Sequence, residues 1–155
     1  MAIKQGPTGK NLPDSAKKLD KFKIGIAVAE WNKTITSALL DGCLKTLSAN
    51  KIPAKNIIIK WVPGSFELPL AAKWMFDFAS SDCVICLGCV IKGETPHNHY
   101  ISESVSLGIT KLSLDYGRPV IFGVLTTDTE QQAIERSGGK NGNKGEDAAI
   151  AALQM

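Results

Sequence analysis

CVICLGCVI, residues 83–91, runs directly into KGETPH, residues 92–97. The first stretch is apolar apart from one glycine, which is typical of a strand buried on both faces of a parallel sheet. In the second stretch, Thr95 suits the N-cap of a helix and Pro96 suits its first position. We therefore predict a buried strand at Cys83–Ile91, followed by a helix that ends near Tyr116, where Gly117 can terminate it.

The alternation of strand and helix continues on both sides of this unit. Short apolar runs predict three more strands, at Phe22–Ala29, Asn56–Val62 and Pro119–Leu125. Helices are predicted at Thr34–Asn50, from Ser65 as N-cap to about Ala79, from Asp128 as N-cap to Arg136, and at Glu146–Met155, with a loop at Ser137–Gly145. Apolar strands that alternate with helices form a parallel sheet covered on both faces. We expect an α/β fold, a flavodoxin-like three-layer α/β/α sandwich, with a four-stranded parallel sheet in the order 2-1-3-4.

Length and composition indicate one ordinary globular domain. The chain has 155 residues, of which 44% are hydrophobic and 21% charged. We place the domain at 21–155, after a flexible arm at 1–20. A net charge of +3 is too small to indicate a nucleic-acid partner, but it suits anionic small substrates. No segment has the apolar length of a signal peptide or a membrane span, so we expect a cytoplasmic protein without a membrane partner.

The spacing of the cysteines raises the question of a metal site. Cys83, Cys86 and Cys89 recur at every third residue, as in some iron–sulfur proteins. In a strand, however, residues three apart point to opposite faces, so Cys86 would point away from the other two. His97 and His99 likewise do not face each other on a helix, because they are two residues apart. We interpret the cysteines as small core residues, unpaired as in a reducing cytosol, and expect no metal.

The candidate site lies at the carboxyl ends of the strands, where ligands of an open parallel sheet bind. The residues that follow the four strands are Glu30–Asn32, Pro63–Glu67, Lys92–His97 and Thr126–Asp128. Gly93 allows the backbone to approach a ligand, and the amides of Glu94 and Thr95 suit an anion such as phosphate. The GxxxxGK[ST] motif is absent, which argues against a nucleoside triphosphate.

Each candidate side chain also has a purely structural explanation. Trp31 and Phe66 can stack on a flat heterocycle or cap the end of the sheet. Glu67 can bind ring N–H groups or favour the start of a helix. His97 can exchange protons or lie unused in the first turn of a helix. Arg136 can clamp a phosphate or complement a helix dipole, and it is hard to bring to the site within one subunit.

Taken together, several stretches resemble the lumazine synthase family. They are AEWN (29–32), VPGSFELP (62–69), LGCVIKGETPHNHYIS (87–102) and PVIFGVLTTDTEQQAIERSGGKNGNKG (119–145), followed by an alanine-rich helix. The resemblance implies a transferase of riboflavin biosynthesis that needs no cofactor. It condenses 5-amino-6-(D-ribitylamino)uracil with 3,4-dihydroxy-2-butanone 4-phosphate to 6,7-dimethyl-8-ribityllumazine. It also implies homopentamers, which in some members build an icosahedral capsid of sixty subunits.

The resemblance assigns a role to each motif residue. The pyrimidine and its ribityl chain would be bound by Trp31, Asn32, Ser65, Phe66, Glu67, Cys89, Val90, Ile91 and Phe122. The phosphate would be bound by Glu94, Thr95 and Arg136, and His97 would transfer protons. Phe122 and Arg136 would come from the neighbouring subunit, which would place the active sites between adjacent subunits and remove the difficulty of reach for Arg136.

Some positions depart from the family pattern. Glu30 stands where many members have a basic residue, Lys92 replaces a common arginine, and Pro96 and His99 stand where threonine and an acidic residue are frequent. The loop SGGKNGNKG is short, which favours the sixty-subunit shell, with riboflavin synthase as a candidate partner.

Two other functions fit the fold. One is an FMN-binding or signalling module, but AEWNKT after the first strand lacks the Ser/Thr-rich character of a phosphate loop. The other is a shell protein that has lost its activity, but His97, Phe66 and Arg136 are all in place.

Overall fold

The computed structural model describes residues 21–155, so the arm expected at 1–20 lies outside the described residues. Four parallel strands form the main sheet: β1 (Ile24–Ala29), β2 (Ile57–Val62), β3 (Cys83–Ile91) and β4 (Val120–Thr127). Their order is β2-β1-β3-β4, which confirms the predicted topology. The longest strand, β3, is central and almost wholly buried, as its uninterrupted apolar sequence requires.

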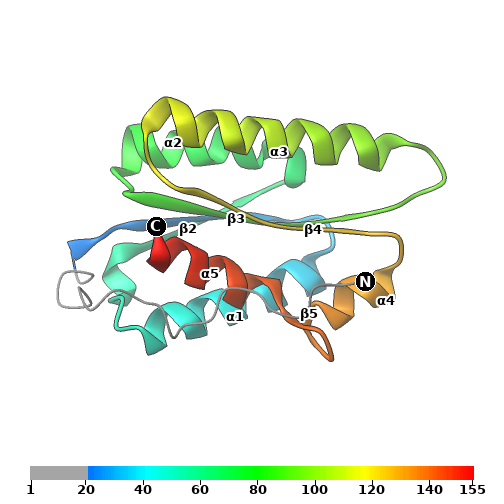
Figure 1. Ribbon diagram of the computed structural model, residues 1–155, viewed down its shortest axis with the longest axis horizontal. Coiled ribbons are helices and arrows are strands. Elements are labelled where there is room, and N and C mark those ends of the chain that lie inside the picture. Colours follow the sequence, from blue (N-terminus) through cyan, green and yellow to red (C-terminus); the bar gives the residue numbers. More distant parts are fainter. Residues whose placement is uncertain (1–20) are drawn as a thin grey trace.

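Helices cover both faces of this sheet (Figure 1). On one face lie α2 (Leu68–Ala79) and α3 (His97–Tyr116), and on the other lie α1 (Lys33–Ala49) and α5 (Lys144–Gln154). The core is accordingly divided into two apolar clusters, one on each face of the sheet. The predicted three-layer α/β/α sandwich is confirmed.

The cysteines of β3 contribute to both clusters. Cys86 packs in the cluster on the α2 and α3 face, whereas Cys89 packs in the cluster on the α1 and α5 face, as strand geometry predicts. All four cysteines are buried free thiols. Burial raises the pKa of Cys43 and of Cys83 to about 12 and that of Cys89 to about 11, so these thiols stay protonated at neutral pH.

Two predicted helix starts on the α2 and α3 face are wrong. The helix α3 begins at His97, with Pro96 rather than Thr95 at the N-cap. Ser65 does not cap an α-helix, because a 3-10 turn at Ser65–Glu67 precedes α2 and the Ser65 hydroxyl has no hydrogen-bond partner. Proline cannot donate a backbone hydrogen bond, and Pro69 accordingly lies in the first turn of α2.

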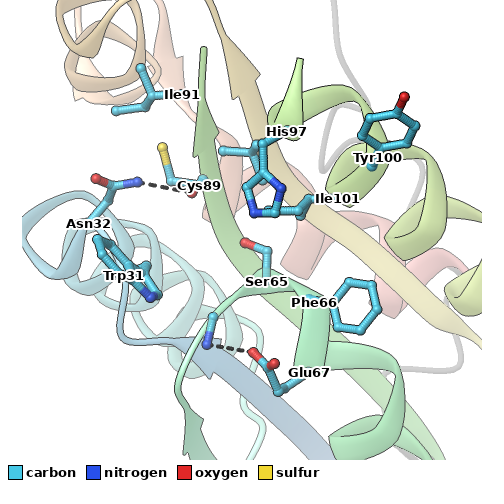
Figure 2. A pocket seen from close by; sticks show the side chains of 12 residues that line it. Trp31, Asn32, Ser65, Phe66, Glu67, Cys89, Ile91, His97, Tyr100 and Ile101 are labelled. Atoms are coloured by element: carbon cyan, nitrogen blue, oxygen red, sulfur yellow. Dashed lines mark hydrogen bonds between the residues drawn. The ribbon is translucent and has the colours of Figure 1, made fainter. Parts of the chain in front are cut away.

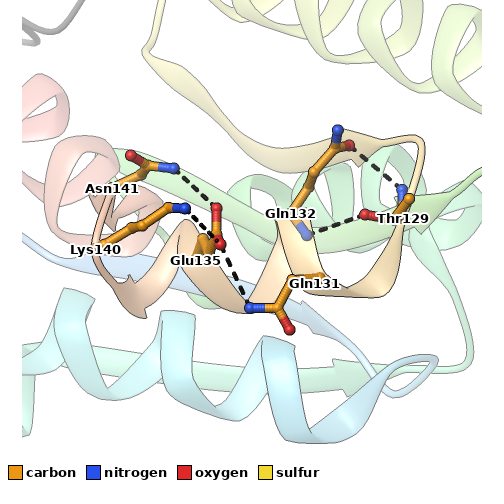
Figure 3. A network of polar contacts seen from close by, with 6 residues as sticks. All are labelled: Thr129, Gln131, Gln132, Glu135, Lys140 and Asn141. Carbon is orange, nitrogen blue, oxygen red and sulfur yellow. Dashed lines mark hydrogen bonds and ion pairs between the residues drawn. The ribbon is translucent and has the colours of Figure 1, made fainter.

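Thr129, not Asp128, caps the short helix α4 (Glu130–Glu135). The Thr129 hydroxyl accepts a hydrogen bond from the backbone N–H of Gln132 at 3.2 Å, and the Gln132 side chain accepts one from Thr129 N–H at 3.3 Å (Figure 3). This reciprocal capping box requires glutamate or glutamine three residues after the cap. Gln131 stands at that distance from Asp128, but it bonds to Glu135 instead.

The segment expected as a loop at Ser137–Gly145 is partly ordered into strands. It contains a small antiparallel hairpin of β5 (Ser137–Gly139) and β6 (Gly142–Asn143). The last helix, α5, begins at Lys144 rather than Glu146, because the Asn143 side chain accepts a hydrogen bond from Gly145 N–H at 2.8 Å. This hairpin connects α4 to α5.

Within residues 21–155, none of the helices is long and apolar enough to cross a membrane.

Candidate active site

A cavity of about 630 Å³ opens at the carboxyl end of the sheet, where the topology predicts a ligand site. The loops after β1 and β2, the end of β3 and the start of α3 contribute to it (Figure 2). Its lining consists of Trp31, Asn32, Gly64, Ser65, Phe66, Glu67, Cys89, Val90, Ile91, His97, Tyr100 and Ile101. Nine of the candidate residues named from the sequence therefore meet in one cavity: Trp31, Asn32, Ser65, Phe66, Glu67, Cys89, Val90, Ile91 and His97.

The loop after β1 is held to both neighbouring strands. The backbone N–H of Trp31 donates to the carbonyl of Pro63 at 3.1 Å, beyond the end of β2. The side chain of Asn32 donates to the carbonyl of Cys89 at 3.0 Å, at the end of β3. Asn32 has a left-handed backbone (φ 58°), a conformation that asparagine tolerates better than most residues. These contacts place the Trp31 indole at the mouth of the cavity.

The two aromatic residues are exposed rather than packed in the core. Trp31 is 73% exposed and Phe66 is 58% exposed, although both line the cavity. A residue that closes the end of a sheet would be buried against it. The structure therefore excludes the explanation that these rings cap the core, and it leaves two flat apolar surfaces open to a ligand.

The loop after β2 brings one carboxylate and one hydroxyl to the cavity. An oxygen of Glu67 accepts a hydrogen bond from the backbone N–H of Gly64 at 2.9 Å. The Ser65 hydroxyl is buried and has no partner among the described residues. It packs so closely on Gly88 that a Cβ there would lie 2.5 Å from it. Buried polar groups are nearly always hydrogen-bonded, so this hydroxyl has an unused hydrogen-bonding capacity beside the cavity.

His97 lies in the first turn of α3, exposed and facing the cavity above Ser65 (Figure 2). Its imidazole makes no hydrogen bond to another described residue, so both ring nitrogens are accessible. His99 does not line the cavity. Among residues 21–155 there is no group of three His, Cys, Asp or Glu side chains that could hold a metal ion.

Four of the candidate residues do not line this cavity: Glu94, Thr95, Phe122 and Arg136. Glu94 and Thr95 are exposed in the turn that leads into α3. Phe122 is aligned with Cys86, whereas Leu125 is aligned with Cys89, so Phe122 lies about 10 Å below the cavity along the strand direction. Arg136 is half-buried just after α4, and its guanidinium has no partner among the described residues.

A polar network is centred on Glu135 (Figure 3), the residue that precedes Arg136. The carboxylate of Glu135 accepts hydrogen bonds from Lys140 at 2.9 Å, Asn141 at 3.2 Å and Gln131 at 3.4 Å. The Lys140 ammonium holds the pKa of Glu135 below its usual range. The network ties α4 to the hairpin, so the backbone at Arg136 is held on both sides.

Three cavity residues were given no individual role from the sequence, although Gly64 lies in the segment Pro63–Glu67 that was expected at the site. Tyr100 and Ile101 lie three and four residues after His97, which places them on the same face of α3 as the histidine. Helical spacing from His97 could have identified both. Gly64 has no such signal, because its contribution is the space that its missing side chain leaves.

The model of the 6,7-dimethyl-8-ribityllumazine synthase family matches residues 21–155. The chain belongs to the lumazine synthase family. A lumazine synthase of Cytophaga hutchinsonii is 55% identical over 131 residues, which cover 84% of this chain and 82% of that protein. One of Parabacteroides distasonis is 49% identical over 145 residues, covering 94% of this chain and 88% of that protein. One of Porphyromonas gingivalis is 52% identical over 134 residues, covering 86% and 83%.

Membership of the lumazine synthase family agrees with the resemblance of the motifs. The match covers the whole described part of the chain, including every loop that lines the cavity. It identifies an enzyme of the transferase class. It argues against the alternative that the flavodoxin-like fold serves as an FMN-binding module here.

Proposed function

We propose that this chain carries out the lumazine synthase reaction in the cavity at the carboxyl end of β1, β2 and β3. It condenses 5-amino-6-(D-ribitylamino)uracil with 3,4-dihydroxy-2-butanone 4-phosphate, the penultimate step of riboflavin biosynthesis. The observation that carries the proposal is the cavity itself. It combines exposed aromatic rings, a carboxylate and an accessible histidine, supplied by separate segments of a chain whose family has this activity.

The pyrimidine substrate fits the end of the cavity formed by the first two loops. The exposed indole of Trp31 offers a flat surface for the ring, and Asn32 supports the loop that carries it. Cys89, Val90 and Ile91 line the ring with main-chain groups. The ribityl hydroxyls suit the second loop, where the Ser65 hydroxyl lacks a partner and Glu67 and Phe66 flank it.

The reaction proceeds between the two substrates and needs little covalent chemistry from the protein. The 5-amino group attacks the ketone and water leaves as a Schiff base forms, phosphate then leaves, and the second nitrogen closes the ring with loss of another water. Holding both reactants in one cavity is the main contribution, worth up to about 7–11 kcal/mol in ideal cases. His97 faces the cavity from α3 and is the residue that we assign to proton transfer.

The phosphate end of the site is completed by a neighbouring subunit. Glu94 and Thr95 offer backbone amides next to the start of α3, within the same subunit as His97. Phe122 and Arg136 do not line the cavity of their own chain, and the Arg136 guanidinium has no partner among the described residues. We assign both to the site of the adjacent subunit, Phe122 to the ring and Arg136 to the phosphate.

An exposed apolar face supports self-association. Leu70, Trp74 and Phe78 recur at every fourth residue of α2 and are all exposed, and Leu107 and Leu114 are exposed on α3. Large apolar side chains that recur along an exposed helix are typical of protein–protein contacts. We propose a homopentamer, assembled further into an icosahedral capsid of sixty subunits in the cytoplasm, with riboflavin synthase as a partner.

Two measurements test this function. The purified chain, mixed with both substrates, is expected to release phosphate and to form the fluorescent lumazine; absence of product at saturating substrates would overturn the assignment. Co-assembly of His97→Ala subunits with Arg136→Ala subunits tests the shared site. Mixed assemblies are expected to exceed the average activity of the two variants, because some sites then receive both native side chains. Activity equal to that average argues for sites within one subunit.

A further inference from the structure

Gly64 lines the cavity between two residues to which the proposed function gives a role. Its backbone is extended, with φ −147° and ψ −179°, a conformation that any residue adopts. The backbone therefore does not require glycine at this position. The reason for glycine must lie in what surrounds the missing side chain.

The surroundings of Gly64 would crowd a Cβ atom on two sides. Such an atom would lie 3.2 Å from Cδ1 of the Trp31 indole and 3.2 Å from Oε2 of Glu67. Both distances are shorter than ordinary van der Waals contacts of about 3.5–4.0 Å. The Trp31 indole and the Glu67 carboxylate therefore both lie against the position that a side chain of residue 64 would occupy.

The backbone of Gly64 also orients the carboxylate. Its N–H donates to Oε2 of Glu67 at 2.9 Å, the contact drawn as a dashed line beside Glu67 in Figure 2. The other oxygen, Oε1, accepts no hydrogen bond from a described residue. One oxygen of Glu67 is thus held by the protein, and the other remains an acceptor at the lining of the cavity.

We infer that Gly64 is a positioning residue that sets the distance between the Trp31 indole and the Glu67 carboxylate, and thereby selects a flat heterocycle that carries an O–H donor on a chain at its edge. The inference rests on the proposed function, since the ribitylamino-pyrimidine is such a heterocycle. A ring stacked on the indole brings the hydroxyls of its ribityl chain to the free Glu67 oxygen only while the indole and the carboxylate are this close. Binding of the phosphate substrate and proton transfer by His97 do not depend on the distance between the indole and the carboxylate.

A side chain at Gly64 must displace one of its two neighbours. The indole is mostly exposed, so it can yield outward by a few tenths of an ångström without unfolding the chain. Gly64→Ala is therefore expected to raise the Kd and the KM for the pyrimidine substrate on the order of fivefold to tenfold. The KM for the phosphate substrate and kcat stay within about twofold of wild type, and Gly64→Val has the same effect more strongly.

A double-mutant cycle separates this role from a general effect on structure. In a chain that carries both Trp31→Ala and Glu67→Ala, adding Gly64→Ala is expected to change the Kd for the pyrimidine substrate by less than about twofold, because both displaced neighbours are gone. An unchanged fivefold to tenfold penalty in that background would show that Gly64 acts elsewhere, and would overturn the inference.

Glu67→Gln provides a second test if Gly64 variants fold poorly. Glutamine can keep its carbonyl oxygen on the Gly64 N–H, but it then presents an amide donor to the cavity in place of an acceptor. We expect the variant to fold normally and to bind the pyrimidine substrate at least fivefold more weakly. Wild-type affinity in Glu67→Gln would overturn the orientation that we assign.

Binding of the pyrimidine substrate alone, measured by calorimetry, distinguishes this inference from the proposed function. A wild-type chain that binds the pyrimidine but forms no product contradicts the proposed function. The Gly64 variants then still test whether the distance between the Trp31 indole and the Glu67 carboxylate controls pyrimidine binding. A chain that forms product, with Gly64→Ala binding the pyrimidine as wild type does, contradicts the inference alone.

Discussion

The side-chain amide of Asn32 donates a hydrogen bond of 3.0 Å to the carbonyl oxygen of Cys89, across 57 residues of sequence. It joins the loop after β1 to the end of β3, and so holds two walls of the cavity at a constant separation. Trp31 precedes Asn32 and depends on the same loop geometry. The orientation of the indole thus rests on a contact between strands that are distant in sequence.

Replacing Asn32 is expected to loosen this wall. Asn32→Ala loses the hydrogen bond, which is worth about 0.5–1.5 kcal/mol. It also places alanine, which lacks the polar side chain that makes asparagine tolerant, in the left-handed backbone conformation, and this costs about 1–2 kcal/mol more. Asn32→Gly loses the same hydrogen bond, but glycine adopts the left-handed conformation without the steric cost. In urea unfolding at one protein concentration, Ala should therefore be the more destabilising substitution. A glycine variant as unstable as the alanine variant would contradict this assignment of the two effects.

Ser65→Ala is expected to separate stability from binding. Removing a buried hydroxyl without a partner should leave the free energy of unfolding unchanged or raise it by about 1 kcal/mol, while affinity for the ribityl-bearing substrate falls. Ser81→Ala is the matched control, since Ser81 is the other buried hydroxyl without a partner in the described chain and does not line the cavity. If Ser81→Ala weakens binding equally, the effect does not arise in the site.

His97→Ala is expected to slow the reaction without abolishing it. Proton transfer by a positioned side chain contributes about 10²–10⁴-fold, whereas the cavity still holds both substrates together. His99→Ala, two residues along α3 and outside the cavity lining, should retain the wild-type kcat. A His97→Ala enzyme with the full rate at saturating substrates would remove this residue from the mechanism.

Arg136→Ala is expected to raise the KM for the phosphate substrate by roughly ten- to hundredfold, the value of charge-assisted hydrogen bonds, and to leave the KM for the pyrimidine nearly unchanged. Arg118→Ala is the control: its guanidinium donates to the Ser81 carbonyl and lies over the Phe76 ring, so its loss should lower stability instead. Equal increases in both KM values would argue against a phosphate clamp at Arg136.

The Glu135 network should contribute stability that depends on pH. The Lys140 ammonium lowers the folded-state pKa of Glu135 below its unfolded value of about 4.3. The stabilisation is therefore present above that value and is lost as the pH falls through the folded pKa. Glu135→Gln should be less stable than wild type at pH 7, and the difference should vanish as the pH falls through the lowered pKa of the folded state. A difference that persists in acid, or that is unchanged in a Lys140→Gln background, would assign the effect to another contact.

The strands and the loops of the site were predictable because their signals are local. The uninterrupted apolar run of Cys83–Ile91 indicates a buried parallel strand, and parallel topology then places the loops after the strands at one edge of the sheet. The helix starts were less predictable. Asp128 and Thr129 are both good capping residues, and the choice between them depends on where Gln132 folds back.

The sequence by itself determined the fold class, the strand order, the family and nine residues of the cavity. Hydrophobic periodicity and linked motifs can be recognised in the sequence without knowing which residues contact one another in the fold. Only the tertiary structure decided that Ser65 has a buried hydroxyl without a partner, that Asn32 reaches Cys89, and that Gly64 leaves room for an indole and a carboxylate. Those features are distances between segments far apart in the chain. They depend on how the strands align and how closely the loops approach, which no local pattern encodes.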